Sequence, residues 1–189
     1  MKNQMSFKIL GLAALVATVT FASAGVAQAA EETMTSNRMQ RTGLSGNYVG
    51  GGIGVGTGLR DDSSQSRFDG NLQGRVMVPR QATRQLPFSG RGSLLFDGDN
   101  VVAVPSVTYD FAVSDRANIY TGLGYSFVGG DGEFTPLGDK NSFIVNGGFE
   151  SVLQDNFVGY TDLKLGTDSF RNNSRGTALS VQAGVGFRF

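Results

Sequence analysis

A strict alternation of apolar and polar residues closes the chain, from Leu179 to the final residue, Phe189. The apolar positions are Leu179, Val181, Ala183, Val185, Phe187 and Phe189, and they alternate with Ser180, Gln182, Gly184, Gly186 and Arg188. Successive side chains of a β-strand point to opposite sides, so this pattern predicts a strand with one apolar and one polar face. Each of these faces must then find its own environment in the fold.

The first 29 residues have the three parts of a bacterial secretory signal peptide. An apolar stretch over residues 9–21 lies between charged and small residues, namely Lys2, Lys8 and the cleavage motif Ala27-Gln28-Ala29. An uncleaved membrane helix is the alternative, but the stretch is short for a span. We therefore predict a signal peptide over 1–29, a periplasmic N-terminal tail over 30–46 and a folded domain over 47–189.

Composition excludes several classes of function. Removal of the signal takes two of the 16 basic residues and none of the 16 acidic ones, which leaves a formal charge of −2. A nucleic-acid partner would need a concentrated basic face, so we expect none. The chain has no histidine, which excludes mechanisms with His as general base or metal ligand. It has no cysteine, so no disulfide holds the exported domain together. We expect no enzyme activity, no cofactor and no metal site.

Eight segments of the domain alternate in the way that the last one does. They are residues 47–57, 71–78, 86–96, 101–111, 117–127, 141–150, 156–166 and 179–189. An even count of eight is the smallest known for outer-membrane barrels. Three long polar connections, 58–70, 128–140 and 167–177, fall on one side, and shorter turns, 79–85, 112–116 and 151–155, on the other. Pro105 lies inside the fourth segment and removes a ladder donor, which predicts a bulge or a misplaced boundary there.

The polar faces of these segments carry charges of both signs. If the apolar faces contact lipid, we expect a polar network in the lumen, made by Arg75, Arg91, Asp110, Glu150, Asp162, Lys164 and Arg188. Buried charges are costly unless they pair. Side chains just fill an eight-stranded barrel, which favours a salt-bridged plug over the alternative, a thin polar channel. The same acids could be proposed as catalytic carboxylates, but a structural role for acids opposite bases is the better interpretation.

Three stretches, 46–54, 109–125 and 184–189, resemble the small bacterial outer-membrane β-barrel proteins related to the opacity, OmpX-like and OmpA-like barrels. The resemblance implies an all-β fold, an eight-stranded antiparallel up-and-down transmembrane β-barrel over 47–189, located in the cell outer membrane. It implies outer-membrane lipid and the barrel assembly machinery as partners. In such proteins the machinery recognises the C-terminal strand, which carries Val185, Phe187 and Phe189 here.

The resemblance implies a structural or surface-interaction role through the extracellular loops, with a ligand that the sequence does not name. A narrow porin-like channel for small solutes is the first alternative. A soluble periplasmic barrel of the lipocalin type, which binds an apolar ligand, is the second. That second alternative requires the apolar faces to point into the barrel and the charged faces to point out of it.

Overall fold

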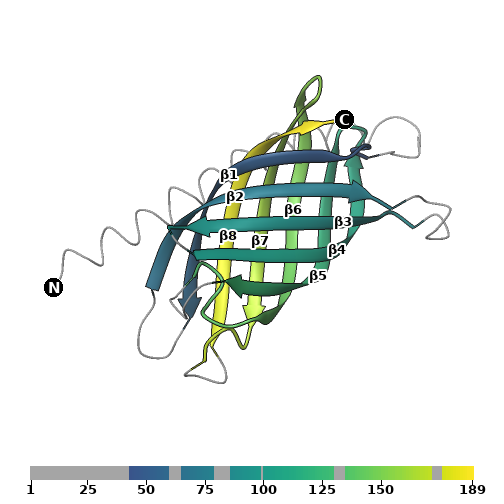
Figure 1. Cartoon of the computed structure of the whole chain (residues 1–189). Coiled ribbons are helices and arrows are strands. Elements are labelled where there is room, and N and C mark those ends of the chain that lie inside the picture. Colours follow the sequence, from purple (N-terminus) through teal and green to yellow (C-terminus); the bar gives the residue numbers. More distant parts are fainter. Residues whose placement is uncertain (1–42, 60–64, 79–85, 99, 130–134, 172–175) are drawn as a thin grey trace. The chain divides into compact units, whose positions relative to one another are not determined.

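The computed structural model describes residues 43–59, 65–78, 86–98, 100–129, 135–171 and 176–189. Eight antiparallel strands form one closed barrel, in which each strand pairs with its neighbours in the chain and β8 pairs with β1 (Figure 1). The strands are β1 Tyr48–Leu59, β2 Gln65–Met77, β3 Phe88–Asp97, β4 Asn100–Ser114, β5 Ala117–Gly129, β6 Ser142–Gln154, β7 Phe157–Thr167 and β8 Thr177–Arg188. The predicted eight-stranded up-and-down barrel is confirmed. The expected signal peptide and residues 30–42 lie outside the described residues.

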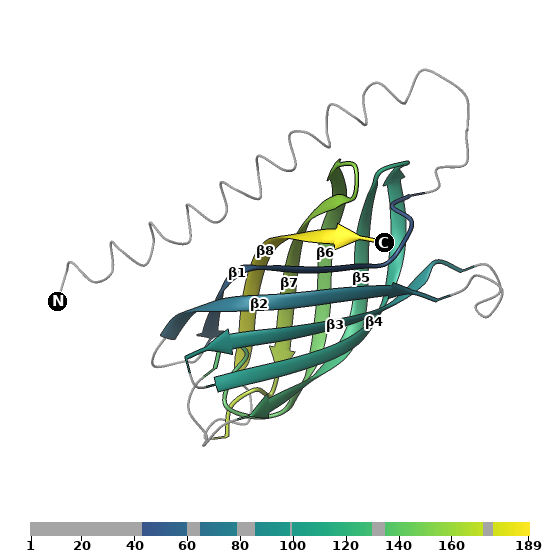
Figure 2. The ribbon, with the colours of Figure 1, turned by 45° about the horizontal axis from the view of Figure 1, so that its top comes forward.

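The register of the strands fixes the stagger of the barrel. Paired residues followed from strand to strand, starting at Arg75, return to β2 at Gln65, ten residues earlier. The intermediate partners are Arg91, Ser106, Gly124, Ile144, Gly166, Ala178 and Gly58. Such a stagger tilts the strands of a small barrel by roughly 35–45°. Strands of the near and far walls therefore cross in projection (Figure 2).

The two ends of the barrel differ in their connections. At the proximal end, where β1 begins and β8 ends, the turns Asp115-Arg116 and Asp155-Asn156 have two residues each. These turns are shorter than the predicted 112–116 and 151–155, because β4 and β6 continue further than the pattern indicates. At the distal end, β3 ends at Asp97 and β4 begins at Asn100, and longer connections follow β5 and β7.

The prediction for the second strand is wrong at its start. Strand β2 begins at Gln65, so the stretch before residue 71 is not all part of an outward loop. The alternation continues through this stretch, because Phe68 is 75% exposed on the outside and Asp69 is 5% exposed on the inside. The charges of Arg67 and Asp69 make the stretch polar overall, and this polarity masks its period of two.

The prediction of a bulge or a misplaced boundary at Pro105 is also wrong, because β4 continues through this residue from Asn100 to Ser114. The β4–β5 register is the same before and after Pro105, at Ala103↔Phe127 and Ser106↔Gly124. The register shift in this pair of strands lies instead between Ala112 and Ser114, next to the proximal turn. Because proline only removes one N–H donor, the surrounding ladder holds the strand in line without an inserted residue.

The outside of the barrel carries the apolar side chains. Phe143 is 73% exposed, Leu123 70% and Ile53 68%, and Val185 and Phe187 of β8 also face outward. Aromatic rings gather near both ends of the wall. Phe88, Tyr109 and Phe111 contact one another in sequence near the proximal end, and Tyr125, Phe127 and Phe143 form a second cluster near the distal end. The barrel therefore has an apolar wall with an aromatic cluster near each of its ends.

Candidate functional site

Two arginines and two carboxylates form a closed ring of ion pairs inside the proximal half of the barrel. Arg75 Nη2 lies 2.9 Å from Asp110 Oδ2, and Arg75 Nη1 lies 2.8 Å from Glu150 Oε1. Arg91 contacts the other oxygens of the same two acids, at 3.0 Å from Asp110 Oδ1 and 2.8 Å from Glu150 Oε2. Each arginine thus bridges both acids, and the net charge of the four groups is zero. We call these four residues the ion ring.

Neutral side chains satisfy the remaining hydrogen-bonding groups of the ion ring. Arg75 Nε donates to Ser89 Oγ at 3.1 Å, and the Ser89 hydroxyl donates to Asp110. Arg91 Nε donates to Thr108 Oγ1 at 3.0 Å. A buried ion pair is stable only when such hydrogen bonds accompany it, because the charges have lost their water. All four members of the ring are at most 6% exposed.

A tyrosine joins the ion ring to a second charged cluster. The guanidinium carbon of Arg91 lies 3.5 Å from the centre of the Tyr120 ring, a cation–π contact. The Tyr120 hydroxyl donates to Asp162 Oδ2 at 2.6 Å, and Lys164 Nζ lies 2.8 Å from Asp162 Oδ1. Lys164 Nζ also donates to Gln182 Oε1 at 3.1 Å. The polar contacts therefore extend across the lumen from β2 to β8.

The N-terminal part of the described chain packs inside the proximal mouth of the barrel. Leu44 is 2% exposed and packs with Tyr48, Val158 and Tyr160. Its carbonyl accepts hydrogen bonds at 3.2 Å from both terminal nitrogens of Arg75. The Asn118 side chain exchanges two further bonds with the Leu44 backbone. This proximal cap is thus tied directly to the ion ring.

A turn from the β5–β6 connection packs inside the distal mouth. Leu137 is fully buried among Leu95, Val102, Val104 and Ile144. The backbone of Pro136 packs so closely on Gly56 that any side chain at position 56 would overlap it. Asp139 N donates to Ser169 O at 3.0 Å, which ties this distal cap to the β7–β8 connection. Parts of the connections that we expect to be contact surface therefore lie inside the barrel mouth.

Three polar groups in the distal half of the lumen lack hydrogen-bond partners among the described residues. Both carboxylate oxygens of Asp69 are of this kind, as are Asn71 Nδ2 and Asn146 Oδ1. Lys164 attracts the Asp69 carboxyl group but forms its ion pair with Asp162. Arg67 forms its ion pair with Asp97, at 2.8 Å. Among the described residues, Asp69 is therefore a buried carboxyl group that no cation pairs with.

The structure brings six of the seven predicted network residues into the lumen contacts. The seventh, Arg188, lies at the proximal rim and donates to Asp155 O at 3.4 Å. The prediction omits Asp69, Leu44 and Leu137. Asp69 could have been predicted, because it alternates in β2 with Asn71, which also faces the lumen. Leu44 and Leu137 lie in polar segments that show no alternation. Their apolar character within those segments is the sequence signal for their burial.

The chemistry of this interior is that of paired charges. Among the described residues, no three Asp, Glu, His or Cys side chains lie close enough to hold a metal ion. The part of the chain that the structure describes contains no helix long and apolar enough to cross a membrane.

Comparison with known proteins bears on the fold. No protein-family model matches the chain, and no curated protein matches its sequence. The crystal structure of Neisserial surface protein A is similar, with a TM-score of 0.55 and 16% identity over 78% of this chain and 99% of that one. Ail, the attachment invasion locus protein of Yersinia pestis, gives a TM-score of 0.49 and 17% identity over 77% of this chain and 100% of its own. At such identities the likeness to surface protein A shows a shared barrel fold.

Proposed function

We propose that the chain is an integral outer-membrane β-barrel protein with a closed lumen and a structural or surface-interaction role. The observation that carries this proposal is the inverted distribution of side chains. Buried arginines, acids and a lysine fill the interior, whereas large apolar side chains cover the outside. A soluble protein rarely exposes apolar surface on this scale, but a barrel in lipid requires it. The aromatic clusters near both ends fit the two membrane–water interfaces.

The direction of the side chains argues against a soluble lipocalin-type barrel. That alternative requires an apolar interior, whereas Arg75, Glu150 and Lys164 are at most 1% exposed inside this one. The ion ring and the two caps argue against the porin-like alternative, because paired side chains occupy the cross-section that a solute would need. A closed barrel acts through its surfaces. The surface name of the similar Neisserial protein agrees with this role.

Strand β8 supports an assembly role for the chain's last residues. Val185 and Phe187 are about half exposed on the outer wall, and Phe189 is 71% exposed at the proximal end. An exposed apolar pattern on the closing strand is available to the barrel assembly machinery before β8 pairs with β1. We propose these three residues as the assembly signal and the distal end as the extracellular end.

Membrane insertion and closure are tested together. Cell envelopes that contain the protein are washed with carbonate, and the folded barrel is examined by heat-modifiable gel mobility and by conductance in planar bilayers. We expect the protein in the pellet, a mobility shift on boiling and a flat conductance baseline. Release into the supernatant would refute membrane integration, and stable single-channel steps would refute the closed lumen.

Orientation is tested by labelling, because the chain has no native cysteine. A single cysteine replaces Lys140 at the distal end, where the side chain is 40% exposed, or the exposed Arg116 in a proximal turn. A membrane-impermeant maleimide applied to intact cells is expected to label Lys140→Cys and not Arg116→Cys. The opposite pattern would place the proximal end outside the cell and overturn the assignment of the distal connections to the cell surface.

A further inference from the structure

The distal half of the lumen contains buried polar atoms that no hydrogen bond among the described residues satisfies. They are both carboxyl oxygens of Asp69, Asn71 Nδ2 and Asn146 Oδ1, on side chains between 3% and 5% exposed. Buried polar groups in folded proteins almost always have a partner, and an exception commonly marks an ordered water molecule or ion. These four atoms therefore point to a bound species in the distal lumen.

Asn71 and Asn146 face the same level of the lumen from opposite walls. Strands β2 and β6 run in the same direction, and Arg75 of β2 forms an ion pair with Glu150 of β6 across the lumen. Each asparagine precedes its member of that pair by four residues, about 13 Å along the strand toward the distal end. Asp69 lies two residues further in the same direction on β2. The unsatisfied atoms thus lie between the ion ring and the distal cap.

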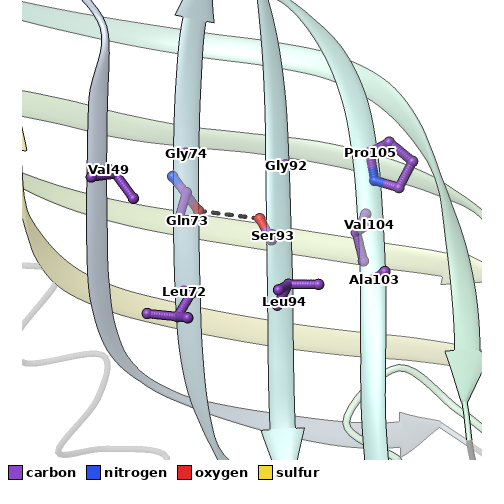
Figure 3. A pocket seen from close by; sticks show the side chains of 10 residues that line it. All are labelled: Val49, Leu72, Gln73, Gly74, Gly92, Ser93, Leu94, Ala103, Val104 and Pro105. Carbon is purple, nitrogen blue, oxygen red and sulfur yellow. Dashed lines mark hydrogen bonds between the residues drawn. The ribbon is translucent and has the colours of Figure 1, made fainter.

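Neighbouring polar side chains of the lumen satisfy one another. Gln73 Nε2 donates to the Tyr48 hydroxyl at 3.0 Å, and Ser93 Oγ donates to Gln73 Oε1 at 3.4 Å (Figure 3). Lys164 Nζ donates to Asp162 Oδ1 at 2.8 Å. The lack of partners is therefore a local feature of the distal lumen and not a general property of the interior.

The buried charges of the described lumen are one positive charge short. They comprise three bases and four acids, namely Arg75, Arg91, Lys164, Asp69, Asp110, Glu150 and Asp162. All of them except Asp69 form ion pairs with one another. A carboxylate that is buried without a counter-charge is costly, and one positive charge beside Asp69 makes the set neutral. A divalent ion would leave an excess of positive charge and would find only one free carboxylate.

A glycine makes room for the carboxyl group of Asp69. Gly54 is the direct partner of Asp69 on β1. A Cβ at position 54 would lie 2.2 Å from Asp69 Oδ1 and 2.8 Å from Gln182 Cγ. The carboxyl group therefore lies over the Gly54 backbone, in the space that a side chain there would fill, and remains inside the lumen.

We propose that the distal lumen binds one hydrated monovalent cation, with the Asp69 carboxylate as its anionic ligand. Carboxylate and water oxygens are the ligands that hard cations prefer. Water molecules on the ion donate to Asn146 Oδ1 and accept from Asn71 Nδ2, so that one hydrated ion satisfies all four atoms. A proton on Asp69 would remove the charge but leave both asparagines unsatisfied. This inference goes beyond the proposed function and departs from the sequence-based expectation of no metal site.

The test uses sodium as the probe. Sodium chloride replaces choline chloride at constant ionic strength around the purified full-length barrel in uncharged detergent micelles. Broadening of the sodium NMR resonance reports bound ion, and the urea midpoint of heat-modifiable mobility reports stability. Asp69→Asn removes the anionic ligand and keeps the shape of the side chain. Asp168→Asn is the matched control, because it makes the same chemical change at the distal end on a side chain that is 53% exposed and paired with Lys140.

We expect wild type and Asp168→Asn to broaden the sodium resonance and to unfold at higher urea as sodium replaces choline, and Asp69→Asn to do neither. Equal responses of all three proteins, or no response of wild type, would overturn the proposal. A midpoint that rises on acidification but not with sodium would also overturn it and would identify a proton as the occupant. A larger shift with calcium than with sodium would contradict the monovalent site. Heat-modifiable mobility without urea shows that each variant is folded.

Discussion

In the proximal half of the lumen, Arg75, Arg91, Asp110 and Glu150 neutralise one another in a ring. In the distal half, Asp69 is buried without any such partner among the described residues, and an apolar turn carrying Leu137 packs inside the mouth. The two halves share the same eight strands and the same stagger. The difference shows that stagger and diameter permit a neutral ionic core but do not impose one. Proximal stability therefore depends on charge balance, and distal closure on apolar packing.

Loss of one acid from the ion ring is expected to lower the free energy of unfolding more than any other change considered below. In Asp110→Asn, two buried arginines share a single carboxylate, and breaking a buried pair in this way costs about 3–5 kcal/mol. The free energy of unfolding is measured from the urea dependence of heat-modifiable mobility in lipid vesicles. If Asp110→Asn lowers the free energy of unfolding by less than the loss of an exposed ion pair does, the ion ring does not stabilise the proximal half.

Truncation of the distal cap is expected to lower the free energy of unfolding by less than Asp110→Asn does. Leu137→Ala removes a buried side chain from the cluster with Leu95 and Ile144, and we expect it to lower the free energy of unfolding by about 2 kcal/mol. Conductance is expected to remain flat, since the ion ring still fills the proximal cross-section. Ion conduction by this variant alone would show that the distal cap, and not the ring, seals the lumen.

Replacement of the unpaired carboxyl group is expected to raise stability instead. Asp69→Asn removes a buried carboxyl group that has no ion-pair partner among the described residues, and in sodium-free buffer we expect a gain of about 1 kcal/mol in the free energy of unfolding. Asp110→Asn is the matched comparison, because the chemical change is identical and only the half of the lumen differs. If both variants lose stability, the contrast between the two halves is wrong.

An exposed ion pair at the distal end has the smallest effect. Lys140 Nζ lies 2.6 Å from Asp168 Oδ2, but the two side chains are 40% and 53% exposed. Lys140→Met is expected to change the free energy of unfolding by about 0.5 kcal/mol and to change it less at high salt. A loss comparable to that of Asp110→Asn would show that this pair holds the distal cap in place.

The strands could be predicted from the sequence because each one repeats the same period of two. The direction of a side chain follows from its parity, so the inward position of Arg75, Glu150 and Lys164 follows from alternation alone. Parity also places Arg188 on the inner face, yet its position at the last residue of β8 puts it on the rim. Alternation gives the side of the wall and not the depth within the barrel.

The partners within the ion ring could not be predicted in the same way. Its members come from β2, β3, β4 and β6, and they meet across the lumen at a depth that the ten-residue stagger determines. That stagger is a property of the closed sheet and leaves no local pattern. The caps are equally hard to foresee, because Leu44 and Leu137 are single apolar residues in aperiodic segments.

The pairing of β1 with β8 has a consequence for biosynthesis. Twelve successive residues of β1, from Tyr48 to Leu59, find their partners in β8. A nascent chain that stops before Thr177 therefore has unpaired backbone along both margins of its sheet, and such margins promote aggregation. Closure must therefore wait until β8, Thr177–Arg188, has been made and exported. Until then the unpaired margins of the sheet are open to association with other chains.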